Sequence, residues 1–191
     1  MRRLPGVGLL CVSALLALPL AAGEAVWPGP RPSGEIQLPN GRLLTPAGTQ
    51  TPVGPYPFAL SVTPDGRQVV VASMGALDQT LQLLDARSGR LLSSVSVERS
   101  WLGLALSPSG DRVFVSGANR NVVLVFRIEG DGLVADGAIP VTGPGDENCD
   151  ALPSGLAVSP DGRFLWVARI HAGDVVKIDL ETAAIVARVQ V

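Results

Sequence analysis

Few residues of this chain have the chemistry for a ligand or metal site. His171 is the only histidine among 191 residues, and it is followed by Gly173-Asp174. A metal site at His171 would need further ligands. The chain has no second histidine, and Cys149, the only cysteine after the first 23 residues, does not lie at metal-binding spacing from it. Residues 146–150 read Asp-Glu-Asn-Cys-Asp and offer oxygen ligands that suit calcium. They lack the glycine-punctuated spacing of a calcium loop, so a solvated surface loop is the simpler interpretation.

A second group of polar residues fits an anionic ligand better than a metal. Asn119 and Arg120 form one short polar segment, and Arg169 directly precedes the segment that holds His171. Guanidinium groups bind carboxylates and phosphates through paired hydrogen bonds. The simpler alternative is that an asparagine at 119 or 121 serves a tight turn, and that His171 is an exposed loop histidine. The sequence thus predicts a ligand site of Asn119, Arg120, Arg169 and His171.

Motifs of catalysis are missing from the sequence. It contains no Gly-x-Ser-x-Gly elbow, no phosphate-binding Gly-x-x-x-x-Gly-Lys loop and no His-Glu-x-x-His helix. We therefore predict no catalytic residue, no metal and no cofactor in the chain shown.

The first 23 residues have the order of a secretory signal peptide. Arg2 and Arg3 precede an apolar run over 7–20, and Ala21-Ala22-Gly23 provides small residues before a cleavage point. A signal anchor is the competing interpretation, but the run is short for a membrane span. We expect a periplasmic or secreted protein with no membrane span after cleavage.

Charge and cysteine content limit the partners. The formal net charge is −2, Lys177 is the only lysine, and the arginines are scattered. Without a basic patch, nucleic acid is not expected as a partner. Cys11 leaves with the signal peptide, so no internal disulfide framework is expected. Cys149 either stays free, pairs with another chain, or pairs with a cysteine in sequence beyond these 191 residues.

An internal repeat sets the expected fold. The turn sequences Pro64-Asp65-Gly66, Pro108-Ser109-Gly110 and Pro160-Asp161-Gly162 begin 44 and 52 positions apart, and the longer spacing holds a polar insertion over 142–151. A period near 44 is what four short strands and their turns occupy in a propeller blade. Proline, Asp or Ser, and Gly at these positions are typical of structural turns.

Each repeat divides into four short apolar runs bounded by Gly, Pro, Asp or Ser. Runs such as 69–72 are apolar throughout, which is typical of strands buried on both faces. The prediction is an all-β fold of β-propeller blades, each of four antiparallel strands. It places the blades at 55–97, 98–141 and 152–191, after an N-terminal extension over 24–54.

The repeat resembles the YVTN-type bacterial β-propeller repeat. The resemblance is carried by Ser159-Pro160-Asp161-Gly162-Arg163, by the following apolar strand, and by Leu83-Leu84-Asp85 and Lys177-Ile178-Asp179; the second repeat departs from it at Phe126-Arg127. Residues 38–48 and 101–105 resemble more narrowly a subgroup in which an exported propeller precedes a phosphoesterase domain of the alkaline-phosphatase superfamily. That narrower resemblance implies catalysis beyond residue 191.

Three blades are fewer than a closed ring needs, since closed propellers have typically four to eight. The chain fits an incomplete ring of six or seven blades. It is part of a longer product, or identical chains form a six-bladed ring, or it is an open stack of three sheets; we favour the first. Self-association through the open blade edge is expected, and 41–48 offers a strand that could close a full ring.

Propeller topology places the loops between second and third strands, and those between blades, on one upper face. These loops are the irregular, polar ones, so the predicted ligand site lies at the upper mouth of the channel. The predicted function is an exported scaffold that binds an unknown small molecule or protein. The alternatives are the N-terminal propeller of a phosphoesterase, and a lactonase-like enzyme whose metal ligands would converge from several blades.

Overall fold

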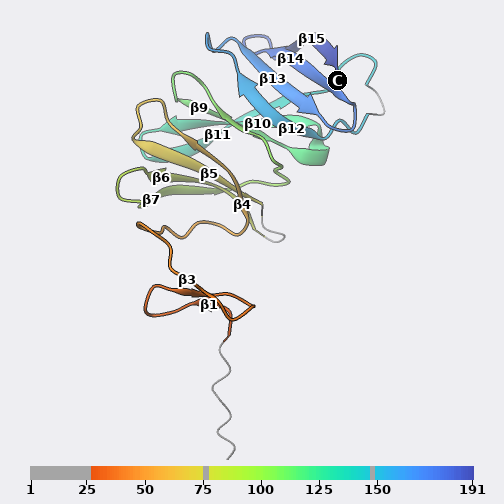
Figure 1. Ribbon diagram of the computed structural model, residues 1–191. Helices are drawn as coiled ribbons and strands as arrows, with labels where there is room; N and C mark the ends of the chain where they lie inside the picture. The colour runs from red at the N-terminus through yellow and green to blue at the C-terminus, as the bar shows by residue number, and fades with distance from the viewer. Residues whose placement is uncertain (1–26, 75–77, 147–148) are drawn as a thin grey trace, which may run out of the picture. The chain divides into compact units, whose positions relative to one another are not determined.

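A computed structural model describes residues 27–74, 78–146 and 149–191 of the chain (Figure 1). It divides into two compact units, Met1–Gly48 and Thr49–Val191. The predicted signal peptide, 1–23, lies outside the described residues. Export of the chain therefore stays a prediction.

The described part of the first unit is one small antiparallel sheet. Its strands are β1 (Gly29–Pro30), β2 (Ile36–Gln37) and β3 (Leu43–Leu44), in the order β1-β2-β3. Gly34 and Gly41 take positive φ angles of 85° and 82° in the two connecting turns, a conformation that glycine adopts without steric cost. The segment suggested as a ring-closing strand thus pairs through β3 with β2, and its role in a ring stays a prediction.

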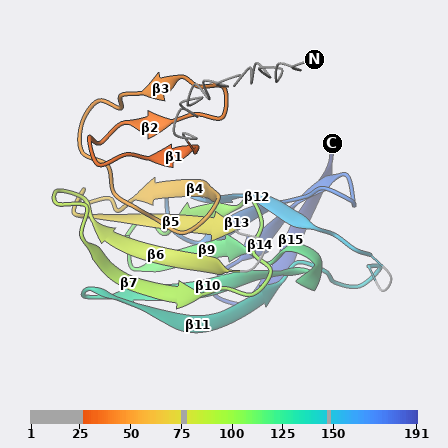
Figure 2. The same cartoon turned by 90° about the horizontal axis from the view of Figure 1, so that it is seen from below.

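The second unit contains three four-stranded antiparallel sheets, each with its strands in chain order (Figure 2). This confirms the predicted all-β fold of four-stranded blades. The first sheet is β4 (Pro57–Val62), β5 (Gln68–Met74), β6 (Gln79–Asp85) and β7 (Leu91–Ser96). The second is β8 (Leu104–Leu106), β9 (Arg112–Ser116), β10 (Val122–Glu129) and β11 (Gly132–Pro140). The third is β12 (Pro153–Val158), β13 (Phe164–Arg169), β14 (Asp174–Asp179) and β15 (Ala184–Gln190). We call these sheets blades 1, 2 and 3.

The repeated Pro-Asp-Gly segments are structural turns. In the first, Thr63 Oγ1 donates to Asp65 Oδ1 at 2.6 Å, and the Arg67 N–H donates to the same oxygen at 3.1 Å. Gly66 closes the turn with a φ of 70°. Hydrogen bonds from the Thr63 side chain and the Arg67 backbone lower the pKa of the Asp65 carboxyl. The aspartate therefore serves its own hairpin.

Two apolar clusters lie where blades meet. Val70, Ala72, Leu81 and Leu83 of blade 1 share one cluster with Val113, Val115, Leu124 and Phe126 of blade 2. The second cluster joins the opposite face of blade 2 to blade 3 through Phe114, Val123, Val125, Leu165, Val167, Val176 and Ile178. In blade 2, alternate residues of the central strands β9 and β10 thus face different neighbouring blades, which explains the continuous apolar runs of these strands.

Strand direction separates the loops into two sets. The β5–β6, β9–β10 and β13–β14 loops and the connections between blades lie at one end of the antiparallel strands, here the upper face. The Pro-Asp-Gly turns and the β6–β7, β10–β11 and β14–β15 turns lie at the other end, the lower face. Among the described residues no helix has the length and apolarity to span a bilayer.

Candidate functional site

Hydrogen bonds join the upper loops of blades 1 and 2. Gln79 Oε1 at the start of β6 accepts a hydrogen bond of 2.6 Å from the Ser100 N–H in the connection to blade 2. Beside it, Arg99 Nη1 donates to Asn119 Oδ1 at 3.3 Å. Asn119 belongs to the short 3₁₀ helix Ala118–Arg120 in the β9–β10 loop. Residues from two blades thus meet on the upper face.

Asn121 extends this network to blade 3. Its Nδ2 donates to the Cys149 carbonyl at 2.8 Å, and its Oδ1 accepts from the Ala151 N–H at 2.9 Å. The N–H of His171 in turn donates to the Ala151 carbonyl at 3.3 Å. Asn121 also takes a φ of 56°, which confirms the turn role that the sequence allowed for an asparagine here. The upper loops of all three blades are therefore held together.

Backbone strain concentrates on this face. Among the described residues, six other than glycine have positive φ angles, and all but Ala183 lie in upper-face segments: Tyr56, Arg99, Ala118, Asn121 and Leu152. Asparagine visits this region readily, but for the others it is uncommon and costs energy. Such strain persists only where surrounding contacts impose it, and it gathers at binding sites.

The predicted site residues lie in this region with different exposures. Asn119 and Arg120 are exposed on the 3₁₀ helix, and His171 is exposed with its Nδ1 3.3 Å from Asp150 Oδ2. In the connection between blades 1 and 2, two residues after Arg99, Trp101 is 39% exposed, and Leu102 is also exposed. Arg99 and Trp101 are the site residues that the sequence analysis missed. Arg99 stands out in the structure by its positive φ angle. Because arginine does not favour this conformation, the residue type could not have predicted it.

Arg169 departs from its predicted role. Its side chain is 1% exposed, and Nε donates to Asp174 Oδ1 at 2.7 Å, while Nη2 donates to the other oxygen of that carboxylate. Nη1 donates to Asp146 Oδ2 at 2.8 Å and to the Val141 carbonyl at 2.9 Å. These contacts raise the pKa of Arg169, first through Asp174 and then, against the effect of burial, through Asp146. The guanidinium is committed to internal carboxylates, so its geometry does not offer the ligand contact expected of it.

Asp146 corrects the expectation of a solvated acidic loop. Its side chain is 7% exposed, and Arg188 Nη1 and Nη2 donate to its two oxygens at 2.9 and 2.6 Å. Together with Arg169, these bonds attach the inter-blade insertion to blade 3. Glu147 and Asn148 lie outside the described residues. Within the described ranges, no group of three or more His, Cys, Asp and Glu side chains could hold a metal ion.

The Asp146 contacts should make stability depend on acidic pH. Burial alone would raise the pKa of the Asp146 carboxyl, but hydrogen bonds from Arg188, Arg169 and the Gly143 backbone outweigh it and lower the pKa to about 2. An unfolded aspartate titrates near ~3.9, so this contribution to stability is complete above that value and is lost as the pH falls toward 2.

We expect Asp146→Asn to lower the free energy of unfolding at neutral pH. Because the native carboxylate is neutralised in acid, the difference between wild type and variant should shrink between about pH 4 and pH 2. Urea unfolding in a pH series measures this difference. A difference that stays constant across that interval would contradict the assigned contacts.

Comparison with known proteins identifies the architecture. No model of a protein family matches the sequence, and no curated protein matches it. Among solved structures, the Myceliophteria thermophila Cps50 (Swd1) β-propeller domain aligns with a TM-score of 0.57 and 14% identity over 70% of this chain and 41% of its own. The WD40 repeats of RRP9 align with a TM-score of 0.56 and 18% identity over 75% of this chain and 39% of theirs. The fold is that of a β-propeller.

A Bacteroides fragilis protein, provisionally named a 6-phosphogluconolactonase, is a third similar structure. It aligns with a TM-score of 0.54 and 19% identity over 71% of this chain and 39% of its own. Such identities show the propeller fold alone. This chain spans half or less of the length of the solved chains that it matches.

Proposed function

We propose that this chain is an exported β-propeller module of the YVTN type that binds its ligand on the upper face, in the periplasm or outside the cell. The signal-peptide pattern of residues 1–23 supports export, and the Ser-Pro-Asp-Gly-Arg repeat supports the type. Propellers serve many functions, so the site itself must indicate the ligand.

The observation that carries the binding proposal is that the upper loops have strained backbones and are joined to one another by hydrogen bonds. Arg99, Ala118 and Leu152 hold positive φ angles there, although their residue types disfavour them. The interlocking bonds of Gln79 and Asn121 supply the contacts that impose this conformation. A surface ordered before binding loses less entropy when a ligand arrives.

The exposed side chains indicate the ligand's chemistry. Arg120 is exposed and Arg99 has one nitrogen on Asn119, so both guanidiniums carry further donors for an oxyanion. Trp101 and Leu102 add exposed apolar area near Arg99 in the chain. The ligand that fits is a small molecule or peptide with a carboxylate or phosphate beside an apolar group.

Two enzymatic functions are less well supported. A phosphoesterase rests on the resemblance of 38–48 and 101–105, and its chemistry would lie beyond residue 191. A lactonase rests on the name of the Bacteroides structure, which is similar to this chain in fold alone. The upper-face binding module is therefore the proposal to test.

The test is a thermal-shift screen of small carboxylates, phosphate esters and peptides with an acidic terminus. For a compound that raises the Tm, we expect Arg120→Ala to weaken binding roughly 10-fold or more, because a charge-assisted hydrogen bond is lost. Arg67→Ala is the matched control, since the Arg67 side chain is 84% exposed on the lower face. Equal loss in both variants, or loss in Arg67→Ala alone, would contradict the upper-face site.

A further inference from the structure

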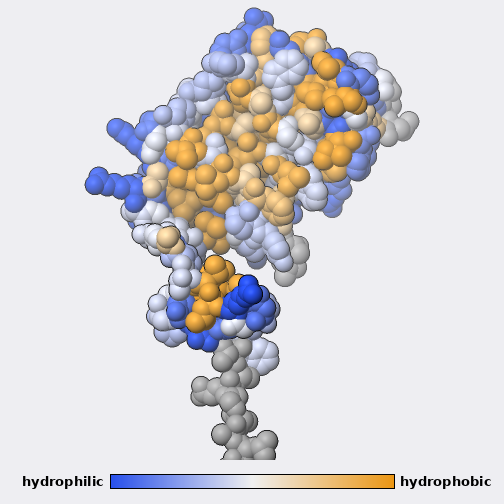
Figure 3. All heavy atoms as spheres, viewed as in Figure 1, coloured by the Kyte–Doolittle hydropathy of each residue, from blue (hydrophilic) through white to orange (hydrophobic). Residues whose placement is uncertain are grey.

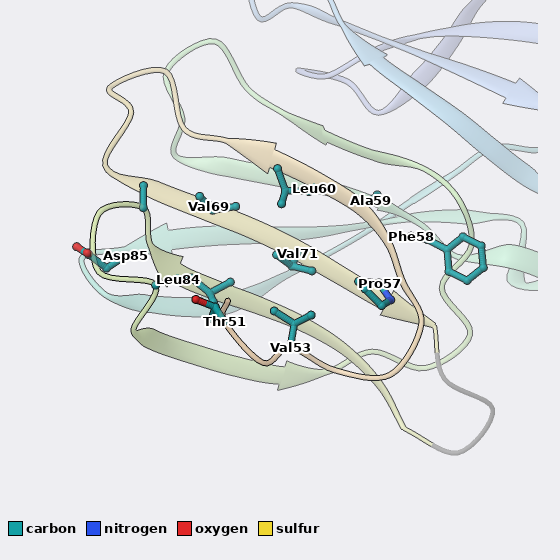
Figure 4. A pocket seen from close by; sticks show the side chains of 12 residues that line it. Thr51, Val53, Pro57, Phe58, Ala59, Leu60, Val69, Val71, Leu84 and Asp85 are labelled. Atoms are coloured by element: carbon teal, nitrogen blue, oxygen red, sulfur yellow. The ribbon is translucent and has the colours of Figure 1, made fainter. Parts of the chain in front are cut away.

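The pocket on the outer face of blade 1 corresponds to a packing surface. Hydrophobic side chains gather over β4 and β5 in Figure 3, and Figure 4 shows a pocket of about 480 Å³ beside β4. Val71 on its floor holds the repeat position that Val167 holds in blade 3, seven residues after the turn proline. Val167 is fully buried in the cluster that joins blades 2 and 3. The pocket floor is therefore the kind of surface on which two sheets pack, and it does not indicate a small ligand.

An aromatic side chain on the upper face does indicate a ligand. The Trp101 side chain is 39% exposed, although its backbone is fixed on both sides. The Trp101 N–H donates to the Ser116 carbonyl at 2.9 Å, and the Val97 N–H donates to the Gln79 carbonyl at 2.9 Å. Between them, the Ser100 N–H donates to Gln79 Oε1 at 2.6 Å. The indole is thus an ordered apolar surface that is partly open to solvent.

The same contacts place basic groups close to the indole. Arg99 Nη1 donates to Asn119 Oδ1 at 3.3 Å, and Arg120 is the next residue of the 3₁₀ helix. The loop that begins after Ser116 is thus joined to the connection between blades 1 and 2 at two points, Arg99 and Trp101. Two successive residues extend the chain by at most about 7 Å, so a small molecule that binds Arg99 can also reach the indole.

The two kinds of side chain select different parts of a ligand. Guanidinium groups bind an oxyanion through charge-assisted hydrogen bonds. An indole attracts a second aromatic ring through offset or edge-to-face contacts, and these stabilise the pair beyond the effect of the buried area. A saturated ring of similar size buries a comparable area but has no aromatic quadrupole, so it gains only the area term.

We propose that the upper face selects small aromatic oxyanions, aryl carboxylates or aryl phosphates. The ring of the ligand lies against Trp101, and its oxyanion accepts hydrogen bonds from Arg99 and Arg120. This inference rests on the proposed upper-face function, to which it adds that the apolar group of the ligand is an aromatic ring.

Isothermal titration calorimetry with matched probes measures this selection on the wild-type chain. Phenyl phosphate and cyclohexyl phosphate carry the same anion, and phenylacetate and cyclohexylacetate form a second such pair. We expect the aromatic member of a pair to bind about 3- to 10-fold more tightly than the saturated member. Equal affinity within both pairs would overturn the aromatic selection, whatever the affinity itself.

Variants assign the preference to one side chain. Trp101→Leu should abolish the preference for the aromatic probe, and Trp101→Phe should retain most of it. Trp166→Leu is the matched control, because Trp166 is a partly buried tryptophan within β13 of blade 3. A preference that survives in Trp101→Leu, or that Trp166→Leu abolishes as well, would overturn the assignment.

The role of Arg120 separates this inference from the proposed function. If no probe binds, or if Arg120→Ala binds the probes as tightly as wild type, the proposed upper-face function fails and this inference fails with it. If both members of each pair bind equally and their binding depends on Arg120, the proposed function stands and only the aromatic selection is overturned.

Discussion

Arg169→Met is expected to lower the free energy of unfolding by about 3–5 kcal/mol. Methionine fills part of the volume but leaves Asp174 buried without its cation and removes a donor from the Val141 carbonyl. Asp146 retains the Gly143 N–H and Arg188, whose side chain is 35% exposed. A buried ion pair that loses one partner costs far more than an exposed one, because the remaining charge has lost both water and its counter-charge.

Urea unfolding followed by circular dichroism measures this loss. The matched control is Arg163→Met, since Arg163 is 62% exposed and bonds to Asp179 at 3.3 Å. Asp179 is buried, but it keeps hydrogen bonds from the Glu181 and Thr182 N–H groups when Arg163 is lost. Because the Arg163 guanidinium is largely in solvent, we expect its loss to lower the free energy of unfolding by less than about 1 kcal/mol. If Arg169→Met is no more destabilised than Arg163→Met, the buried network does not hold blade 3 as described.

We expect Gly103→Ala to lower the free energy of unfolding by about 3 kcal/mol. Gly155→Ala, at the same position of the next repeat, should leave the free energy of unfolding within about 0.5 kcal/mol of wild type. A Cβ on Gly103 would lie 1.9 Å from the Ser154 carbonyl oxygen and 2.7 Å from Leu156 Cγ. The obstacle is backbone of blade 3, so relief requires that blades 2 and 3 move apart. At Gly155, the nearest atom to such a Cβ is Ala168 Cβ at 3.8 Å, an ordinary contact.

Blade 1 provides a natural comparison for these two variants, because its equivalent residue is Ala59. Thermal unfolding of wild type, Gly103→Ala and Gly155→Ala measures the loss of stability that each substitution causes. Equal destabilisation by the two substitutions would show that the repeat position itself, and not the contact between β8 and β12, requires glycine.

The fold could be predicted because each blade contains local signals. Pro64, Pro108 and Pro160 mark the first hairpin of each blade, and each repeat forms four strands, as its four apolar runs predict. The continuous apolar run over 69–72 predicts a strand with apolar side chains on both faces. In the structure, Val70 and Ala72 face blade 2, and Val71 lines a pocket on the other face of blade 1.

The buried ion network could not be read from the sequence, because its partners are far apart in the chain. Asp146 and Arg169 are separated by 23 positions, and Asp146 and Arg188 by 42. An acidic run in a polar insertion ordinarily faces solvent. One feature of the sequence does indicate a buried ion pair. Arg169 lies nine positions after its turn proline, where the first two repeats have the small residues Ser73 and Gly117. A charge at a repeat position otherwise occupied by small residues needs a partner.

The boundary before blade 1 was equally hidden. The repeat pattern places residues 49–54 in the N-terminal extension, but they belong to the second compact unit. The Gly54 N–H donates to Gln82 Oε1 at 2.7 Å, across 28 positions of sequence. Gly54 must also be small, because a Cβ there would lie 2.6 Å from Thr80 Oγ1. Neither contact leaves a periodic pattern in the sequence.

Hydrogen–deuterium exchange with and without a ligand from the thermal-shift screen tests most directly that the upper face binds. We expect the ligand to slow exchange in residues 98–101, 117–121 and 170–173, which carry the strained and basic positions. The lower-face turns at 63–67, 107–111 and 159–163 should exchange at unchanged rates. Protection of those turns, with the upper loops unaffected, would contradict the account.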